Sequence, residues 1–151
     1  MQVTSKGALF VFIQLLLFLI YIIDLVEIPM SFPKFLSPIG VVLMVVGGLV
    51  LIIAILQLNI NLSPFPKPVK GSKLISNGVY TYIRHPIYSG IIISFLGNGL
   101  YKASIVKIAV TALLLLLFYF KSIYEEGLLQ KAHPDYKAYM KKTYRLFPWI
   151  L

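Results

Sequence analysis

The chain has 151 residues, of which 59% are hydrophobic and 13% charged, whereas soluble globular domains average about 25% charged residues, so an ordinary soluble domain is excluded. The formal net charge of +9 would suggest a nucleic-acid partner in a soluble protein, but long uncharged runs favour a membrane protein with no nucleic-acid partner. The chain has no cysteine, which excludes disulfides and thiolate metal ligands, and no metal site is predicted.

Four apolar runs predict four transmembrane helices, because about 20 residues of helix cross the hydrocarbon core. We place them at residues 7–26, 35–58, 86–101 and 103–124. The first run lacks a small-residue cleavage site, so we interpret it as a retained helix and not as a signal peptide. Lys107 lies one turn inside the fourth run, from where its side chain can extend back to the interface.

The remaining segments predict a loop at residues 59–85 and an amphipathic helical tail at residues 125–151. The loop contains Pro64, Pro66 and Pro68, and the tail repeats apolar residues at helical spacing with a break at Pro134. The expected architecture is therefore all-α. It is a single membrane-embedded helical bundle of residues 1–151 with a surface-lying tail that contacts membrane lipids.

The basic residues predict the orientation of this bundle. With four spans, eleven of the fourteen Lys and Arg residues fall on one side, and only Lys34, Lys102 and Lys107 fall on the other. By the positive-inside rule both termini, the loop and the tail face the cytoplasm. In a prokaryotic cell this places the protein in the inner or plasma membrane.

Two polar clusters lie at the predicted cytoplasmic ends of the last two spans. Arg84, His85 and Pro86 precede the third span, and Glu125 and Glu126 follow the fourth. If these helix ends lie at one depth, the clusters meet in a pocket covered by the tail. The alternative is that the first cluster anchors a helix at the headgroups and that the glutamates pair with nearby lysines.

Pro86 suits the first turn of a helix, where free amides can bind an anionic group. The amides of Ile87 and Tyr88 are the candidates. Tyr80, Tyr82 and Tyr88 lie near the same corner and could hold a cation on an aromatic face. The alternative for these rings is the aromatic belt of the membrane interface.

Three sequence elements together resemble a known family. Residues 77–90 read NGVYTYIRHPIYSG, residues 125–129 read EEGLL, and residues 136–148 read YKAYMKKTYRLFP. These resemble the signatures of the isoprenylcysteine carboxyl methyltransferases and the related phospholipid methyltransferases, in the same order. The resemblance covers residues 72–149, about half of the chain, and the first two spans contribute only topology.

The resemblance implies an integral membrane methyltransferase that uses S-adenosylmethionine and releases S-adenosylhomocysteine. It implies that His85 and the amides after Pro86 bind the methionyl carboxylate, and that Glu125 binds the amino or ribose end. Tyr80 and Tyr88 would line the adenosyl or sulfonium part. The full set of implied cofactor contacts is Ser72, Lys73, Leu74, Ile75, Tyr80, Arg84, His85, Pro86, Ile87, Tyr88 and Glu125.

Three residues are candidates for a catalytic role toward the methyl acceptor. Lys121 stands where eukaryotic members of the family place an arginine, and a lysine lacks the bidentate fork that grips a carboxylate. Arg145 could supply that fork if the tail folds back, with a headgroup contact as the alternative. Glu126 could accept the proton of an amine substrate.

The expected acceptor is a lipophilic molecule, similar to an isoprenylcysteine or a phospholipid, that is methylated on a carboxylate or an amine. Its apolar part could reach the site along the small residues Gly90, Ser94 and Asn98. Two other functions stay open. One is a non-enzymatic membrane protein with a lipid-binding basic tail, and the other is a sterol-reductase-like enzyme that uses NADPH.

Overall fold

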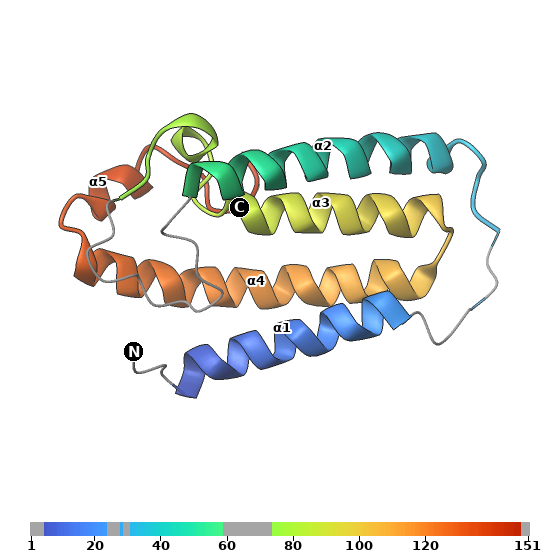
Figure 1. The fold of residues 1–151 in the computed structure, drawn as a ribbon, viewed down its shortest axis with the longest axis horizontal. Coiled ribbons are helices and arrows are strands. Elements are labelled where there is room, and N and C mark those ends of the chain that lie inside the picture. The colour runs from blue at the N-terminus through green and yellow to red at the C-terminus, as the bar shows by residue number, and fades with distance from the viewer. Residues whose placement is uncertain (1–4, 24–27, 29–30, 59–73, 149–151) are drawn as a thin grey trace.

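The computed structural model describes residues 5–23, 28, 31–58 and 74–148, and in these ranges the chain is a bundle of helices (Figure 1). The prediction of an all-α fold is confirmed. In chain order the elements are α1 (Ser5–Ile23), α2 (Leu36–Leu58), the 3-10 helix η2 (Gly78–Thr81), α3 (Pro86–Tyr101), α4 (Ile105–Ala132) and α5 (Tyr136–Met140).

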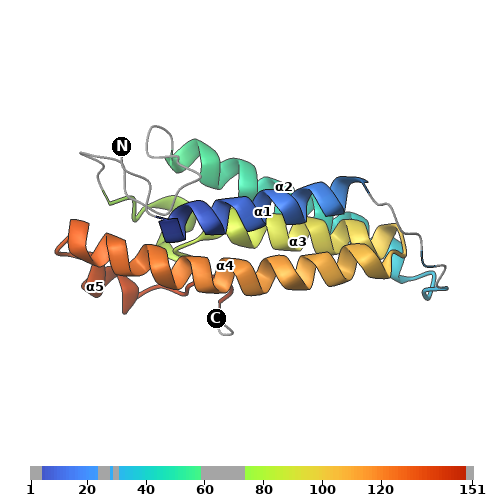
Figure 2. The ribbon, with the colours of Figure 1, turned by 90° about the horizontal axis from the view of Figure 1, so that it is seen from below.

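The four long helices run along a common axis in both views (Figure 1 and Figure 2). In the described part of the chain, α1, α2 and α4 are long and apolar enough to cross a membrane, so the protein is an integral membrane protein. Helix α3 has 16 residues, which makes it about 24 Å long and shorter than the ~30 Å hydrocarbon core. Its role as a fourth span stays a prediction.

Helices α2 and α3 form the tightest packing of the bundle, with glycines on both sides. A Cβ atom at Gly47 would lie 2.5 Å from the backbone nitrogen of Ser94, and one at Gly40 would lie 2.5 Å from the carbonyl oxygen of Gly97. Such close backbone approach is typical of small residues in membrane helix pairs. Gly90 and Ser94 therefore pack against α2, which argues against this stripe as the route of the acceptor.

Helix α4 extends eight residues beyond its predicted end at residue 124, to Ala132. The helix of the fourth predicted span therefore continues into the segment predicted as the tail, and the point at which the span ends stays a prediction. No proline occurs in α4 before Pro134, and His133 adopts the extended conformation that a following proline favours. Glu125 and Glu126 thus lie on a continuous helix, which fixes their directions.

The tail is also less helical than predicted. After α4 it contains the five-residue α5, and turns follow from Lys141 to Pro148. A parallel β-bridge joins Ile83 to Tyr144. The tail therefore follows the loop before α3 and does not continue as one amphipathic helix.

Lys107 contacts the last turn of α1, and whether this point lies at the membrane interface stays a prediction. Its side chain is buried, and its Nζ donates a hydrogen bond of 2.8 Å to the carbonyl oxygen of Tyr21, near the C-terminal end of α1. The ammonium also lies 4.5 Å from the centroid of the Tyr21 ring. A cation at this position complements the negative end of the α1 dipole, so Lys107 attaches α1 to α4.

Two adjacent glycines of α2 provide a matched test of the α2–α3 packing. Gly47→Ala places a methyl group against the backbone of α3, whereas a Cβ atom at Gly48 has no neighbour within 4 Å. We expect Gly47→Ala to destabilise the protein by about 1–3 kcal/mol and Gly48→Ala to be neutral or slightly stabilising. Thermal unfolding in detergent measures both, and equal effects would contradict this packing.

Candidate active site

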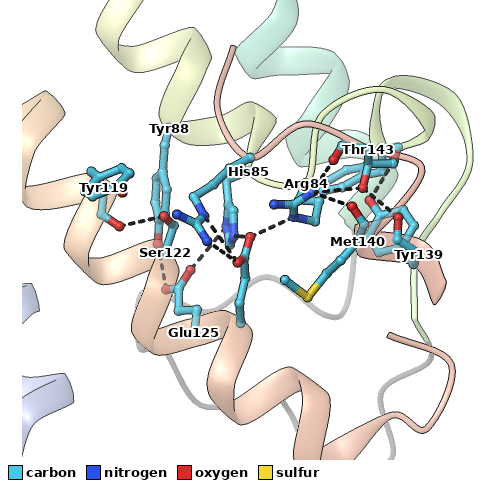
Figure 3. Close-up of polar contacts among 12 residues, drawn as sticks. Arg84, His85, Tyr88, Tyr119, Ser122, Glu125, Tyr139, Met140 and Thr143 are labelled. Carbon is cyan, nitrogen blue, oxygen red and sulfur yellow. Dashed lines mark hydrogen bonds and ion pairs between the residues drawn. The ribbon is translucent and has the colours of Figure 1, made fainter. Parts of the chain in front are cut away.

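The two predicted polar clusters meet at one end of the bundle. Arg84 and His85 immediately precede Pro86, the first residue of α3, while Glu125 and Glu126 lie near the C-terminal end of α4. Figure 3 shows side chains from both helix ends and from the tail converging at this point. The cluster therefore joins three segments that are distant in sequence.

Glu126 is held by two arginines. Nε of Arg84 donates to its Oε1 at 2.7 Å, and Nη2 of Arg145 donates to its Oε2 at 2.8 Å. The Glu126 side chain is only 2% exposed. Since both carboxylate oxygens face guanidinium groups, the geometry favours a structural role for Glu126 over the predicted role as a base.

Arg145 likewise differs from its predicted role as a fork for the substrate. Besides its two hydrogen bonds to Glu126, its guanidinium lies 5.4 Å from the ring centroid of Tyr119. Contact with the Glu126 carboxylate raises the pKa of Arg145 above its usual value. The tail does fold back, but its arginine is bound within the protein.

Arg84 fastens the tail from the other side (Figure 3). Its Nη1 donates to the carbonyl oxygens of Met140 and Thr143 and to the Thr143 hydroxyl. Main-chain bonds continue the attachment: the Arg84 amide donates to Tyr144, and the His85 amide donates to Arg145. The tail is therefore ordered over the loop before α3 by both side-chain and backbone contacts.

Glu125 points to a different set of partners. Its Oε1 accepts a hydrogen bond of 2.6 Å from the Tyr88 hydroxyl, and its Oε2 lies 3.4 Å from Nδ1 of His85. The Glu125 side chain is 13% exposed, so this carboxylate is more accessible than that of Glu126. Glu125 is the carboxylate of the pair that can still meet a ligand.

His85 lies between the two glutamates and is 8% exposed. Its Nε2 is 3.4 Å from Oε1 of Glu126, within ion-pair distance, yet this buried nitrogen has no hydrogen-bond partner in the described residues. Burial lowers the pKa of His85, but contacts with Glu125 and Glu126 outweigh burial and raise it above 6.5. The imidazole is thus held between two carboxylates, and its Nε2 makes no hydrogen bond within the described residues.

Tyr88 supports this cluster more than it lines a cation site. Its ring stacks on Phe118 with centroids 4.3 Å apart and lies parallel to the His85 ring at 5.5 Å. The Lys121 ammonium is 5.3 Å from the Tyr88 centroid. These neighbours already contact the ring, so the predicted sulfonium-lining role of Tyr88 is not favoured.

Lys121 is 1% exposed, and its side chain is directed toward α1. Its Nζ donates a hydrogen bond of 2.8 Å to Oε1 of Gln14, on α1. The sequence interpretation missed Gln14 and gave α1 only a topological role. The available signal was an amide in an otherwise apolar span, since polar side chains at that depth are costly and often functional.

The other predicted cofactor residues line the loop before α3. Tyr80 is buried, with its hydroxyl 3.3 Å from the Ala54 carbonyl on α2, and its own carbonyl accepts a bond from Tyr139. Leu74 and Ile75 are half-buried, and so is Ile87. Ser72 and Lys73 lie outside the described residues.

One predicted amide donor is occupied. The Tyr88 amide donates to the His85 carbonyl oxygen at 3.1 Å, because the first turn of α3 closes onto the residue before Pro86. The Ile87 amide stays the candidate for an anionic group.

The sequence model of the phospholipid methyltransferase family matches residues 35–135. The chain belongs to the phospholipid methyltransferase family. This membership favours a membrane methyltransferase over the reductase and the non-enzymatic protein. The matched residues run from the start of α2 past the end of α4 and include both polar clusters, while α1 precedes them.

Two curated relatives match a shorter stretch of this phospholipid methyltransferase family member. The chain is 34% identical over 80 residues to the cobalt-zinc-cadmium resistance protein CzcN of Cupriavidus metallidurans, which is 52% of this chain and 37% of that protein. It is 32% identical over 80 residues to the nickel-cobalt-cadmium resistance protein NccN of Alcaligenes xylosoxydans xylosoxydans, 52% of this chain and 38% of that protein. The match thus spans little more than a third of each relative.

In the described ranges, there is no group of three or more His, Cys, Asp or Glu residues that could hold a metal ion.

The two adjacent glutamates offer a matched test of the tail attachment. Glu126→Gln leaves two guanidinium groups without their carboxylate, a loss that costs about 3–5 kcal/mol when a buried pair is broken. We expect the variant to unfold at lower temperature and to be cut faster by trypsin at the exposed Lys141 and Lys142. Glu125→Gln, which removes no contact to the tail, serves as the control. Equal cleavage rates would contradict the role of Glu126.

His85 should make the stability of the protein depend on pH. Because its pKa is higher in the folded protein than the usual 6.5, its stabilising contribution is complete below pH 6.5 and is lost as the pH rises through the folded pKa. The difference in melting temperature between wild type and His85→Gln should therefore shrink as the pH rises. A difference that stays constant or grows with pH would contradict the ion pairs of His85.

Proposed function

We propose that this protein transfers a methyl group from S-adenosylmethionine to a lipophilic acceptor at the cytoplasmic face of the membrane. The observation that carries the proposal is the buried His85 imidazole, whose Nε2 makes no hydrogen bond within the described residues, beside the partly exposed Glu125 carboxylate in a member of the phospholipid methyltransferase family. The cytoplasmic orientation of this end rests on the positive-inside rule.

The chemistry of these residues fits the proposed cofactor, which carries a carboxylate, an amino group and a sulfonium. Nε2 of His85 and the Ile87 amide are donors for the carboxylate, and the raised pKa of His85 favours the charged imidazole, which adds attraction. Glu125 is an acceptor for the amino group or the ribose hydroxyls. Leu74, Ile75 and the buried Tyr80 would supply the apolar side of the same site.

When bound, the cofactor supplies an electrophilic methyl group on a positively charged sulfur. The displacement needs little acid or base help, so the protein contributes chiefly by orienting the reactants and by excluding water. The tail supports both effects, because its bonds to Arg84 and His85 hold it at this end of the bundle. A carboxylate acceptor needs no base, and the double contact of Glu126 with arginines disfavours it as a base for an amine.

The acceptor we propose is similar to an isoprenylcysteine or a phospholipid, with an apolar chain in the bilayer and an anionic group near the site. Lys121 is the favoured cation for that group, because its ammonium donates to a neutral amide oxygen, whereas Arg145 is paired with the Glu126 carboxylate. The metal-resistance names of the two relatives describe those proteins. In this chain the described site contains donors and acceptors suited to an organic ligand.

Calorimetric titration of the detergent-purified protein with S-adenosylhomocysteine tests the proposal. We expect saturable binding that His85→Ala and Glu125→Ala each weaken at least about tenfold, the usual effect of losing a charged hydrogen bond. His133→Ala, which alters a histidine outside the cluster, is the control. Absence of binding in detergent and in lipid nanodiscs would overturn the proposal, and saturable binding of NADPH instead would support the reductase.

A further inference from the structure

The geometry of Gln14 points to a role for α1 in the active site. Gln14 lies in the middle of α1, a 19-residue helix whose neighbouring side chains are almost all apolar. An amide at that depth is costly unless it has a partner. Its partner is Lys121, whose buried ammonium lies 2.8 Å from the amide oxygen.

Lys121 also lies close to the cofactor cluster. It is one helical turn before Glu125 on α4, so the two side chains share a face. Its ammonium is 5.3 Å from the ring centroid of Tyr88, and the Tyr88 hydroxyl donates to Glu125. A continuous series of contacts therefore runs from Gln14 through Lys121 and Tyr88 to Glu125.

This arrangement contains a competition for Glu125. The Glu125 carboxylate contacts Tyr88 through Oε1 and His85 through Oε2. A buried ammonium strongly favours a carboxylate over a neutral acceptor, so Lys121 would be drawn toward Glu125 if it lost the acceptor on α1. Gln14 provides that acceptor, at 2.8 Å from an ammonium that lies 5.3 Å from the Tyr88 ring centroid.

We propose that Gln14 is a positioning residue that retains the Lys121 ammonium on α1 and thereby keeps the Glu125 carboxylate available to His85 and Tyr88. The effect of Gln14 on cofactor binding rests on the proposed function. Its effect on the positions of Lys121 and Glu125 does not. The proposal also goes beyond the family match, which begins at residue 35 and leaves α1 outside. Helix α1 then adds a polar contact from outside the residues that the family model matches.

The imidazole of His85 reports the charge of Glu125 directly, and it can be observed without any ligand. The titratable and charged groups around it are Glu125 and Glu126 on α4, Tyr88 on α3, Arg84 beside it, Arg145 on the tail, and Lys121 through Glu125. If Lys121 pairs with Glu125, the negative potential at His85 falls and the imidazole loses its proton at lower pH.

The experiment is an NMR titration of the imidazoles in the full-length protein, in detergent, with His133→Gln used to assign the two histidine signals. We expect Gln14→Leu to lower the His85 midpoint by about half a pH unit or more. Gln14→Glu, which also retains the ammonium, should leave the midpoint at or above the wild-type value. Leu15→Ala, on the lipid-exposed side of α1, is the control and should leave it unchanged.

A double-mutant cycle shows whether Gln14 acts through Lys121. In the Lys121→Met background, Gln14→Leu should no longer move the His85 midpoint, because there is no ammonium to divert. An unchanged midpoint in Gln14→Leu, or the same shift in the Lys121→Met background, would overturn the proposal.

Binding of S-adenosylhomocysteine separates this proposal from the proposed function. If both are correct, Gln14→Leu weakens binding at least about threefold at pH 7.5, and Gln14→Glu restores it. If the wild type binds no S-adenosylhomocysteine but the midpoint still moves as expected, the proposed function fails and the positioning role of Gln14 stands.

Discussion

The contact on which the site depends is the buried group of charges formed by Arg84, Glu126 and Arg145. Each member belongs to a different segment: the residue pair before α3, the end of α4, and the tail. A buried carboxylate is unstable without charged partners, so Glu126 requires both arginines in place. The same requirement brings three distant parts of the chain to one point and orders the tail over the loop.

The positions of Arg84 and Glu126 depend on how α3 packs against its neighbouring helices. The glycines of α2 and α3 bring the two backbones into direct contact, which sets the depth at which α3 begins. The other side of α3 packs against α4 through Tyr88 and Phe118. Since α3 packs against α2 on one side and α4 on the other, its start is fixed relative to α4. Arg84 and His85 therefore lie level with Glu125 and Glu126.

The two adjacent glutamates have different roles because this geometry gives them different partners. Glu126 neutralises the arginines and fastens the tail, whereas Glu125 faces the imidazole and a tyrosine hydroxyl and keeps some exposure. The structural carboxylate is thus the better buried one. A ligand that meets Glu125 and His85 would find its site already assembled, which reduces the cost of ordering groups on binding.

The sequence by itself determined the all-helical membrane architecture, because long uncharged runs have no other stable form in a bilayer. It also predicted that Arg84 and His85 meet the two glutamates, since polar groups at helix ends of equal depth converge. What only the tertiary structure decided is which partner each residue takes. Neighbouring residues on a helix point about 100° apart, so the pattern EE could not show that only Glu126 binds the arginines while Glu125 binds the Tyr88 hydroxyl. Gln14 was missed because its partner Lys121 is 107 residues away in the sequence. Only the packing of α1 against α4 brings the two side chains together.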